Sequence, residues 1–228
     1  MLFQFLFPRS RITGIGRVLQ RMNLLRWLPL ALLWSPSLPG CSALRTVVLP
    51  GFGNAIEDYD GFTEVLARRG VQTAVVPIER RDWLNIAAGV LSPRFWACSC
   101  VPDDLFRFYY DKVDATVKAA AEDGPVTLLC HSAGGWLARG LVRDNDWRGT
   151  QTPASELVEG IVTLGSPHFP PESGECMTRG ALAYVATRFP GAHLKELYYM
   201  SVAGTAVMSD PSKLTPYITG FPFTPRRR

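Results

Sequence analysis

Short apolar runs alternate along the chain with segments whose apolar residues lie four positions apart. The apolar runs predict strands at 45–50, 71–78, 126–130, 157–164 and 198–203. The intervening segments carry the spacing that is typical of helices, and two of these segments end at a glycine. Strands that alternate with helices predict an α/β fold, with a mainly parallel sheet covered by helices on both faces.

The segments between the strands predict helices with defined ends. After the first strand, Asn54 and Glu57 have the spacing of a capping box, and the helix that they open ends at Gly70. A second helix is predicted over 103–124 because apolar residues recur at every fourth position. A third helix is predicted near 179–188. The segment 79–102, which prolines interrupt, is predicted to be a long loop.

The segment 130–134, Cys-His-Ser-Ala-Gly, is a variant of the G-x-S-x-G nucleophile elbow. It stands between the buried strand 126–130 and a helix that begins at Gly134. The sharp turn would strain the backbone of Ser132 and expose its hydroxyl, and the crowding beside it requires small residues. Gly134 meets that requirement, whereas Cys130 replaces the usual glycine. The pattern therefore predicts Ser132 as a catalytic nucleophile, against the alternative of an ordinary strand-to-helix turn.

A glycine-rich turn, Gly51 to Gly53, follows the first core strand directly. A turn at this place can direct a backbone N–H at the serine of the elbow. Together with the N–H of Ala133, the N–H of Phe52 would form an oxyanion hole. Without the elbow, an ordinary glycine turn would be the preferred interpretation.

A serine hydroxyl needs a base, and the chain contains three histidines. His131 lies inside the elbow, where we expect it to point away from Ser132 and to pack. His168 is expected to have a structural role, with the role of base as the alternative. His193 precedes the last predicted strand and is expected to be a solvated residue at a helix end.

The N-terminal 50 residues differ in charge from the rest of the chain. The first 50 residues contain six arginines and no acidic residue, whereas the remainder holds 18 basic against 20 acidic residues. The net charge of +4 therefore arises in the leader, and we predict no nucleic-acid partner. The leader, residues 1–43, has the composition of a transit peptide, which favours a plastid (chloroplast) location. Its apolar run 27–34 leaves a secretory signal and the endoplasmic reticulum or endomembrane open, as well as an untargeted disordered end.

The five cysteines have no paired C-x-x-C spacing, so free thiols and no metal site are expected. Cys98 and Cys100 are too isolated from further ligands to predict zinc binding.

Several motifs together resemble the α/β-hydrolases of the lipase type. The resemblance is nearest to the plant and cyanobacterial proteins related to GPI inositol-deacylase, and it covers residues 46 to 207. It implies a serine ester hydrolase that acts on an acyl or lipid ester without a metal or cofactor, with peripheral membrane contact as an open alternative. The matching segments are LPGFGN (49–54), DYDGF (58–62), RRGV (68–71), DWLNIAAG (82–89), CHSAGGWLAR (130–139), TLGSPH (163–168) and, more weakly, VAGTAV (202–207).

In that family the catalytic acid and histidine follow the strand that corresponds to 198–203. Here the proline-rich segment 208–228 stands in their place, and it contains no histidine. Asp210 is the candidate acid, with a turn cap as its alternative. We therefore expect a leader (1–43), an α/β-hydrolase domain (44–207) that lacks its last strand and catalytic histidine, and an irregular tail. A truncated isoform, an early-terminated gene model or a degenerate enzyme would explain this.

Three functions remain open at this stage. The first is a serine ester hydrolase that forms an acyl-enzyme on Ser132; the second is a non-catalytic binding or scaffold protein with the same fold; the third is an acyltransferase. Trp83 and Trp96 are candidates for lining an acyl pocket above Ser132, or they pack the loop that contains them.

Overall fold

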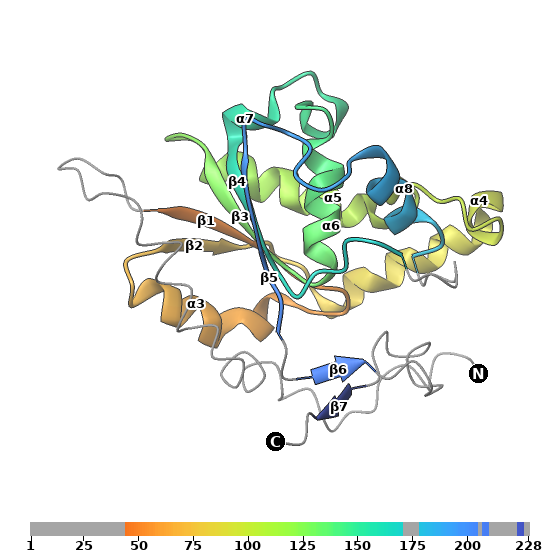
Figure 1. Cartoon of the computed structure of the whole chain (residues 1–228), viewed down its shortest axis with the longest axis horizontal. Coiled ribbons are helices and arrows are strands. Elements are labelled where there is room, and N and C mark those ends of the chain that lie inside the picture. Colours follow the sequence, from red (N-terminus) through yellow and green to blue (C-terminus); the bar gives the residue numbers. More distant parts are fainter. Residues whose placement is uncertain (1–43, 171–177, 205–206, 210–222, 226–228) are drawn as a thin grey trace.

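The computed structural model describes residues 44–170, 178–204, 207–209 and 223–225 (Figure 1). The leader 1–43, Asp210 and most of the tail lie outside the described residues, and so do Cys41 and Cys176.

Five parallel strands form the central sheet in the order β2-β1-β3-β4-β5. Each of the five predicted strands is present, although β2 is shorter than its apolar run. The strands are β1 (Arg45–Leu49), β2 (Gln72–Val75), β3 (Val126–His131), β4 (Val158–Leu164) and β5 (Tyr198–Val202).

Helices cover both faces of this sheet, as the sequence predicted (Figure 1). One face is covered by α5 (Pro102–Ala120), α6 (Ala133–Val142) and α8 (Ala181–Arg188), and the other by α3 (Asp60–Ala67). Side chains alternate along each strand, so neighbouring residues enter different cores. Val47 and Leu128 therefore belong to the core under α5 and α6, while Val48 and Leu129 belong to the core under α3.

Helix α5 shows why its spacing was informative. Its apolar residues at every fourth position, Leu105, Tyr109, Val113 and Val117, are all buried against the sheet. Burial of one such side chain stabilises the fold by about 1.5–3 kcal/mol. The helix ends at Ala120, and Gly124 reverses the chain into β3 with a φ of 126°.

The long loop predicted at 79–102 is wrong, because this segment is largely helical. It contains the 3-10 helix η3 (Arg80–Leu91) and the short helix α4 (Pro93–Trp96). Tertiary contacts organise it: Asp82 accepts a hydrogen bond from Lys112 of α5, and Gly89 lies so close to Leu105 that a side chain there would overlap with it. The sequence pattern does not record such contacts, since they come from a distant helix.

The capping box predicted at Asn54 and Glu57 is displaced by one residue. A 3-10 helix, η2 (Ile56–Tyr59), precedes α3, and the carboxylate of Asp58 accepts the N–H of Ala55 at 3.0 Å. The side chain of Asn54 donates to the same carboxylate at 3.1 Å instead of capping the helix. Helix α3 ends at Ala67, three residues before the predicted end at Gly70, which closes the following turn with a φ of 76°.

Several smaller elements were not predicted. They are η4 (Trp147–Gly149), α7 (Ala154–Leu157), β6 (Val207–Ser209) and β7 (Phe223–Pro225). The last two pair with each other as a separate antiparallel sheet (Figure 1), so the described parts of the predicted irregular tail are strands. Proline is compatible with the end of a short edge strand, where Pro225 lies.

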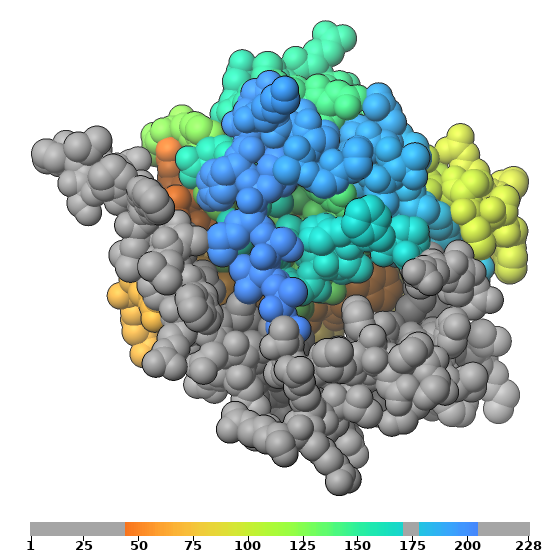
Figure 2. Space-filling model, in the orientation of Figure 1, coloured from red at the N-terminus to blue at the C-terminus, as the bar shows by residue number. Residues whose placement is uncertain are grey.

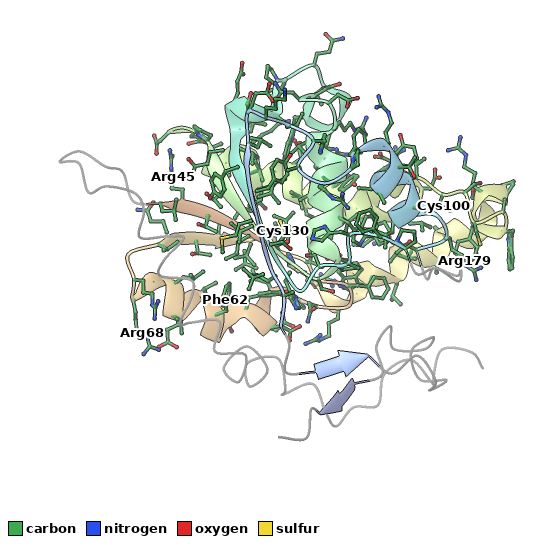
Figure 3. All side chains as sticks on the ribbon, in the orientation of Figure 1. Arg45, Phe62, Arg68, Cys100, Cys130 and Arg179 are labelled. Carbon is green, nitrogen blue, oxygen red and sulfur yellow. The ribbon has the colours of Figure 1, made fainter. Side chains whose placement is uncertain are left out.

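Strand β5 forms one edge of the five-stranded sheet and lies at the molecular surface (Figure 2). Cys98, Cys100 and Cys130 are free thiols, as predicted. Cys130 lies at the middle of the sheet, whereas Cys100 lies near Arg179 at one end of the molecule (Figure 3). Within the described ranges, no helix is both long enough and apolar enough to cross a bilayer.

Candidate active site

Ser132 lies at the sharp turn between β3 and α6. Its φ of 51° and ψ of −119° are unusual for a residue with a side chain, and such conformations cost about 1–3 kcal/mol. The turn is held from both sides, because Ser132 N–H donates to Leu164 O at 2.9 Å and Gly135 N–H donates to Ser132 O at 3.2 Å. The strained turn that the elbow motif predicted is therefore present, and Ser132 is only partly buried.

The residues beside Ser132 are small because α6 presses closely on the sheet. A Cβ at Gly134 would lie 2.7 Å from Leu49 O, which real Cβ atoms do not do. Cys130 is completely buried beneath the turn, and burial raises the pKa of its thiol. The requirement for glycine extends one residue further than predicted, since a Cβ at Gly135 would overlap with Ser166 Oγ. The sequence offered a signal for this second position in the paired glycines.

The turn at Gly51 to Gly53 lies directly against the elbow. A Cβ at Gly51 would come within 2.9 Å of both Ser132 Cβ and His131 Nδ1. Glycine is therefore required here by the close approach of two segments that are 80 residues apart in sequence. The structure brings together the two segments that the sequence proposed as partners.

Most polar groups of this turn are already bonded. Pro50 O accepts from Tyr109 Oη at 2.7 Å, Gly51 N–H donates to Tyr59 Oη at 2.9 Å, and Gly51 O accepts the N–H of Asn54 at 3.0 Å. Asn54 O accepts Trp83 Nε1–H at 2.8 Å. Three of these contacts come from other elements, α5, η2 and η3, and they fix the position of the turn.

Two amides remain free beside Ser132. Over the described part of the chain, neither the N–H of Phe52 nor that of Ala133 donates a hydrogen bond to a protein group. Ala133 is the first residue of α6, where N–H groups have no partner within the helix. Free donors near a partly exposed serine can stabilise a negatively charged oxygen.

One arginine supports the turn through an ion pair and a hydrogen bond. Arg80 bonds to Asp58 at 2.7 Å and to Gly53 O at 3.3 Å, so one side chain joins η3 to η2 and to the turn. Burial acts to raise the pKa of Asp58, but the Ala55 N–H, Arg80 and Asn54 outweigh it and lower the pKa overall. Asp58 is therefore ionised at neutral pH.

His131 bonds to a tyrosine. Its Nδ1 lies 2.8 Å from Tyr59 Oη, and burial lowers its pKa even though nearby Asp58 acts in the opposite direction. The predicted packing role is thus refined to a hydrogen-bonded one.

The other two histidines lie elsewhere. His168 Nε2 approaches Ser201 Oγ at 3.3 Å and Thr163 Oγ1 at 3.4 Å, and its backbone O accepts from Arg139 at 3.0 Å. His193 is partly buried rather than solvated, with Nε2 on the backbone O of Arg143. Because Arg143 follows the last residue of α6, that contact lies about 15 Å from Ser132 along the helix.

Both tryptophans proposed for substrate binding have other contacts. Trp83 is 9% exposed, and its ring packs against those of Phe52, Phe108 and Tyr109. Trp96 is exposed on α4, where its contacts are with Phe95 and Val90 O in its own segment. The sequence analysis considered only the amide of Phe52. The structure shows that its side chain also offers an apolar ring at the same turn.

The comparison with solved structures identifies the architecture. A lipase of Bacillus licheniformis, BlEst2 in its mature form, superimposes with a TM-score of 0.51, with 13% identity over 75% of this chain and 70% of that chain. The chain has an α/β-hydrolase fold. This fold class is the one predicted from the sequence.

Two further solved structures match less closely. A soluble variant of the Saccharomyces cerevisiae monoglyceride lipase has a TM-score of 0.37 and 18% identity, over 59% of this chain and 40% of that chain. An acetyl xylan esterase has a TM-score of 0.38 and 11% identity, over 79% and 93%. No protein family model and no curated protein sequence matches the chain.

Proposed function

We propose that the chain is a serine ester hydrolase in which Ser132 attacks the ester carbonyl. The observation that supports this most directly is a strained, partly exposed serine beside two amides, Phe52 N–H and Ala133 N–H, that have no acceptor among the described residues. The α/β-hydrolase fold places such a serine at the same topological position in ester hydrolases. The resemblance to lipase-type proteins supports the same reaction class.

The chemistry proceeds in two halves. Ser132 Oγ forms a bond to the carbonyl carbon, and the negative charge develops on the carbonyl oxygen beside the amides of Phe52 and Ala133. The bond to the leaving alcohol then breaks, and the proton from Oγ is transferred to that alcohol. Water attacks the resulting acyl-enzyme, releases the acid and returns a proton to Ser132. Loss of one oxyanion donor typically costs about 3–4 kcal/mol of transition-state stabilisation.

The proton acceptor is the part of this mechanism that the described residues do not supply. His131 faces Tyr59, His168 faces Ser201, and His193 lies at the far end of α6. Asp210, proposed as the acid, lies outside the described residues. We therefore expect slow turnover, limited by proton transfer from Ser132, with reactive probes detected more readily than substrate hydrolysis.

The substrate that we propose for this site is an ester with an apolar acyl group. Phe52 is 48% exposed, and its ring packs against that of Trp83 with a centroid distance of 5.0 Å. The ring therefore offers an apolar surface on the same residue as the proposed donor amide. The resemblance to proteins related to GPI inositol-deacylase supports a lipid ester.

The arrangement of the histidines favours one alternative, a binding protein that retains the hydrolase fold. Such a protein would hold an ester or carboxylate at the free amides without cleaving it. The two functions differ in whether Ser132 forms a covalent bond.

Labelling with a fluorophosphonate probe separates these functions. We expect covalent modification of the folded chain that is lost in Ser132→Ala and retained in Ser166→Ala, a matched control whose buried hydroxyl has no hydrogen-bond partner within the described ranges. Equal labelling of all three proteins, or none in a folded preparation, would exclude the hydrolase. Product analysis with an added alcohol then distinguishes hydrolysis from acyl transfer.

A further inference from the structure

Tyr59 joins the two segments of the proposed site. Its hydroxyl oxygen accepts the N–H of Gly51 at 2.9 Å and lies 2.8 Å from His131 Nδ1. Gly51 begins the turn that carries Phe52, while His131 immediately precedes Ser132. A single side chain from η2 therefore contacts the backbone of one segment and the side chain of the other.

The direction of these hydrogen bonds follows from the groups available. Because the hydroxyl oxygen of Tyr59 already accepts from Gly51, its own proton needs an acceptor. Tyr59 is 2% exposed, and a buried hydroxyl proton without an acceptor is unfavourable. Among the described residues the only acceptor it contacts is His131 Nδ1, so neutral His131 carries its proton on Nε2. Burial keeps this histidine neutral by lowering its pKa.

The close packing around Gly51 explains why this bridge can affect the position of the Phe52 amide. A Cβ at Gly51 would lie only 2.9 Å from Ser132 Cβ, so the gap between the turn and the elbow has no room for a side chain. A small movement of Gly51 would carry the Phe52 N–H with it and change its distance from an oxygen bound at Ser132. Hydrogen-bond donors of this kind act only when they are held in position.

We propose that Tyr59 is a positioning residue that fixes the Phe52 amide relative to Ser132 by bridging Gly51 N–H and His131 Nδ1. The expected effect on the reactivity of Ser132 rests on the proposed function. The hydrogen-bonded bridge itself does not depend on it. Tyr59 does not touch the substrate in this arrangement. It acts through the two segments that it joins.

Tyr109 provides a matched control. It is also buried, and its hydroxyl also bonds to the turn, but it donates to Pro50 O, and no hydrogen bond joins it to His131 in the described part of the chain. Tyr59→Phe and Tyr109→Phe therefore each remove one hydroxyl from the same turn. Only the first breaks the bridge to the elbow.

The first measurement is amide hydrogen exchange and the nitrogen chemical shifts of His131 by NMR. In Tyr59→Phe we expect exchange at Gly51 to accelerate at least tenfold and the Nε2–H form of His131 to lose its dominance. Tyr109→Phe should leave both unchanged. The proposal is overturned if Gly51 exchanges equally in the two variants, or if wild-type His131 carries its proton on Nδ1.

The second measurement is the kinetics of fluorophosphonate labelling at Ser132. Tyr59→Phe should lower the maximal rate constant about tenfold or more without weakening probe binding, whereas Tyr109→Phe should change it less than threefold. His131→Ala should resemble Tyr59→Phe, and His131→Asn, which keeps an acceptor near Nδ1, should restore part of the rate. Equal rates in wild type and Tyr59→Phe would overturn the proposal. If wild type itself is not labelled, the hydrolase function fails, and the NMR measurement still decides the bridge.

Discussion

The carboxyl ends of β1 and β3 differ sharply from those of β4 and β5, although both pairs lie at the same edge of the sheet. At the first pair, Tyr59, Tyr109 and Trp83 are buried and bond to the turn at 2.7–2.9 Å. At the second pair, His168 meets Ser201 and Thr163 at 3.3–3.4 Å, and Ser201 is exposed. Buried side chains with short hydrogen bonds thus hold the half that contains the proposed nucleophile, whereas longer contacts at a more exposed position hold the other half.

This difference shows that a strained backbone conformation needs stabilising contacts close to the strained residue. Ser132 keeps an unfavourable backbone conformation, which persists only when surrounding contacts outweigh its cost. Those contacts are concentrated around the turn and α6. Substitutions on the two sides should therefore differ in their effects, from several kcal/mol at the elbow to almost none near Ser201.

The largest effect is expected for Gly134→Ala. The new Cβ would meet the backbone oxygen of Leu49, which cannot move away without distorting β1. We expect the free energy of unfolding to fall by about 2–4 kcal/mol, measured by urea denaturation. Gly61→Ala is the matched control, because a Cβ there meets nothing within 4 Å, and it should leave stability unchanged or improve it by about 0.5–1 kcal/mol. Equal effects would contradict the close packing of α6 on the sheet.

Trp83→Phe comes next. The indole N–H donates to Asn54 O, so the variant leaves a buried acceptor unsatisfied while retaining an aromatic ring. We expect a loss of about 1–3 kcal/mol in the free energy of unfolding and slower labelling of Ser132. Trp96→Phe, on exposed α4, serves as the control and should alter neither quantity. Slower labelling in Trp96→Phe and not in Trp83→Phe would show that the acyl group contacts α4.

The pH dependence of stability should reveal the buried histidine of the elbow. The pKa of His131 is lowered in the folded chain by burial, so the unfolded chain binds its proton first as the pH falls. Its contribution is fully present above about pH 6.5 and is lost as the pH falls below that value toward the folded pKa, with a slope of at most about 1.4 kcal/mol per pH unit.

His131→Asn tests this assignment, because it removes the titrating group and keeps a polar side chain. The curve of unfolding free energy from pH 7.5 to 5.5 should be flatter for the variant than for wild type. Some slope should remain, since burial and then Arg139 lower the pKa of His168 as well. Parallel curves would show that the pKa of His131 is the same in the folded and unfolded states.

Ser201→Ala should have the smallest effect. Its hydroxyl accepts from Thr163 at 3.0 Å on an exposed edge strand, where water can replace it. We expect a change within about 0.5 kcal/mol in thermal or urea unfolding and no change in labelling of Ser132. A tenfold loss of labelling would place β5 in the reactive site and remove the contrast between the two halves.

The elements were predictable from local patterns wherever burial alone dictates them. The apolar runs gave all five strands of the main sheet, and the four-residue spacing of Leu105 through Val117 located α5. The segment 79–102 failed because its helices depend on Lys112 and Leu105 of α5, contacts that no local pattern records. The capping box failed for a related reason, since Asn54 and Glu57 have the required spacing but Asp58 has the better geometry.

For the candidate site, the sequence by itself determined the strand-turn-helix around Ser132 and the glycine turn at 51–53, because small residues at those positions are demanded by local sterics. Only the tertiary structure decided that the two turns touch, that Tyr59 links them and that the histidines face other groups. Those outcomes depend on how η2, α5 and α6 pack on the sheet. Contacts between segments 80 residues apart are set by that packing, not by the residues on either side of each turn.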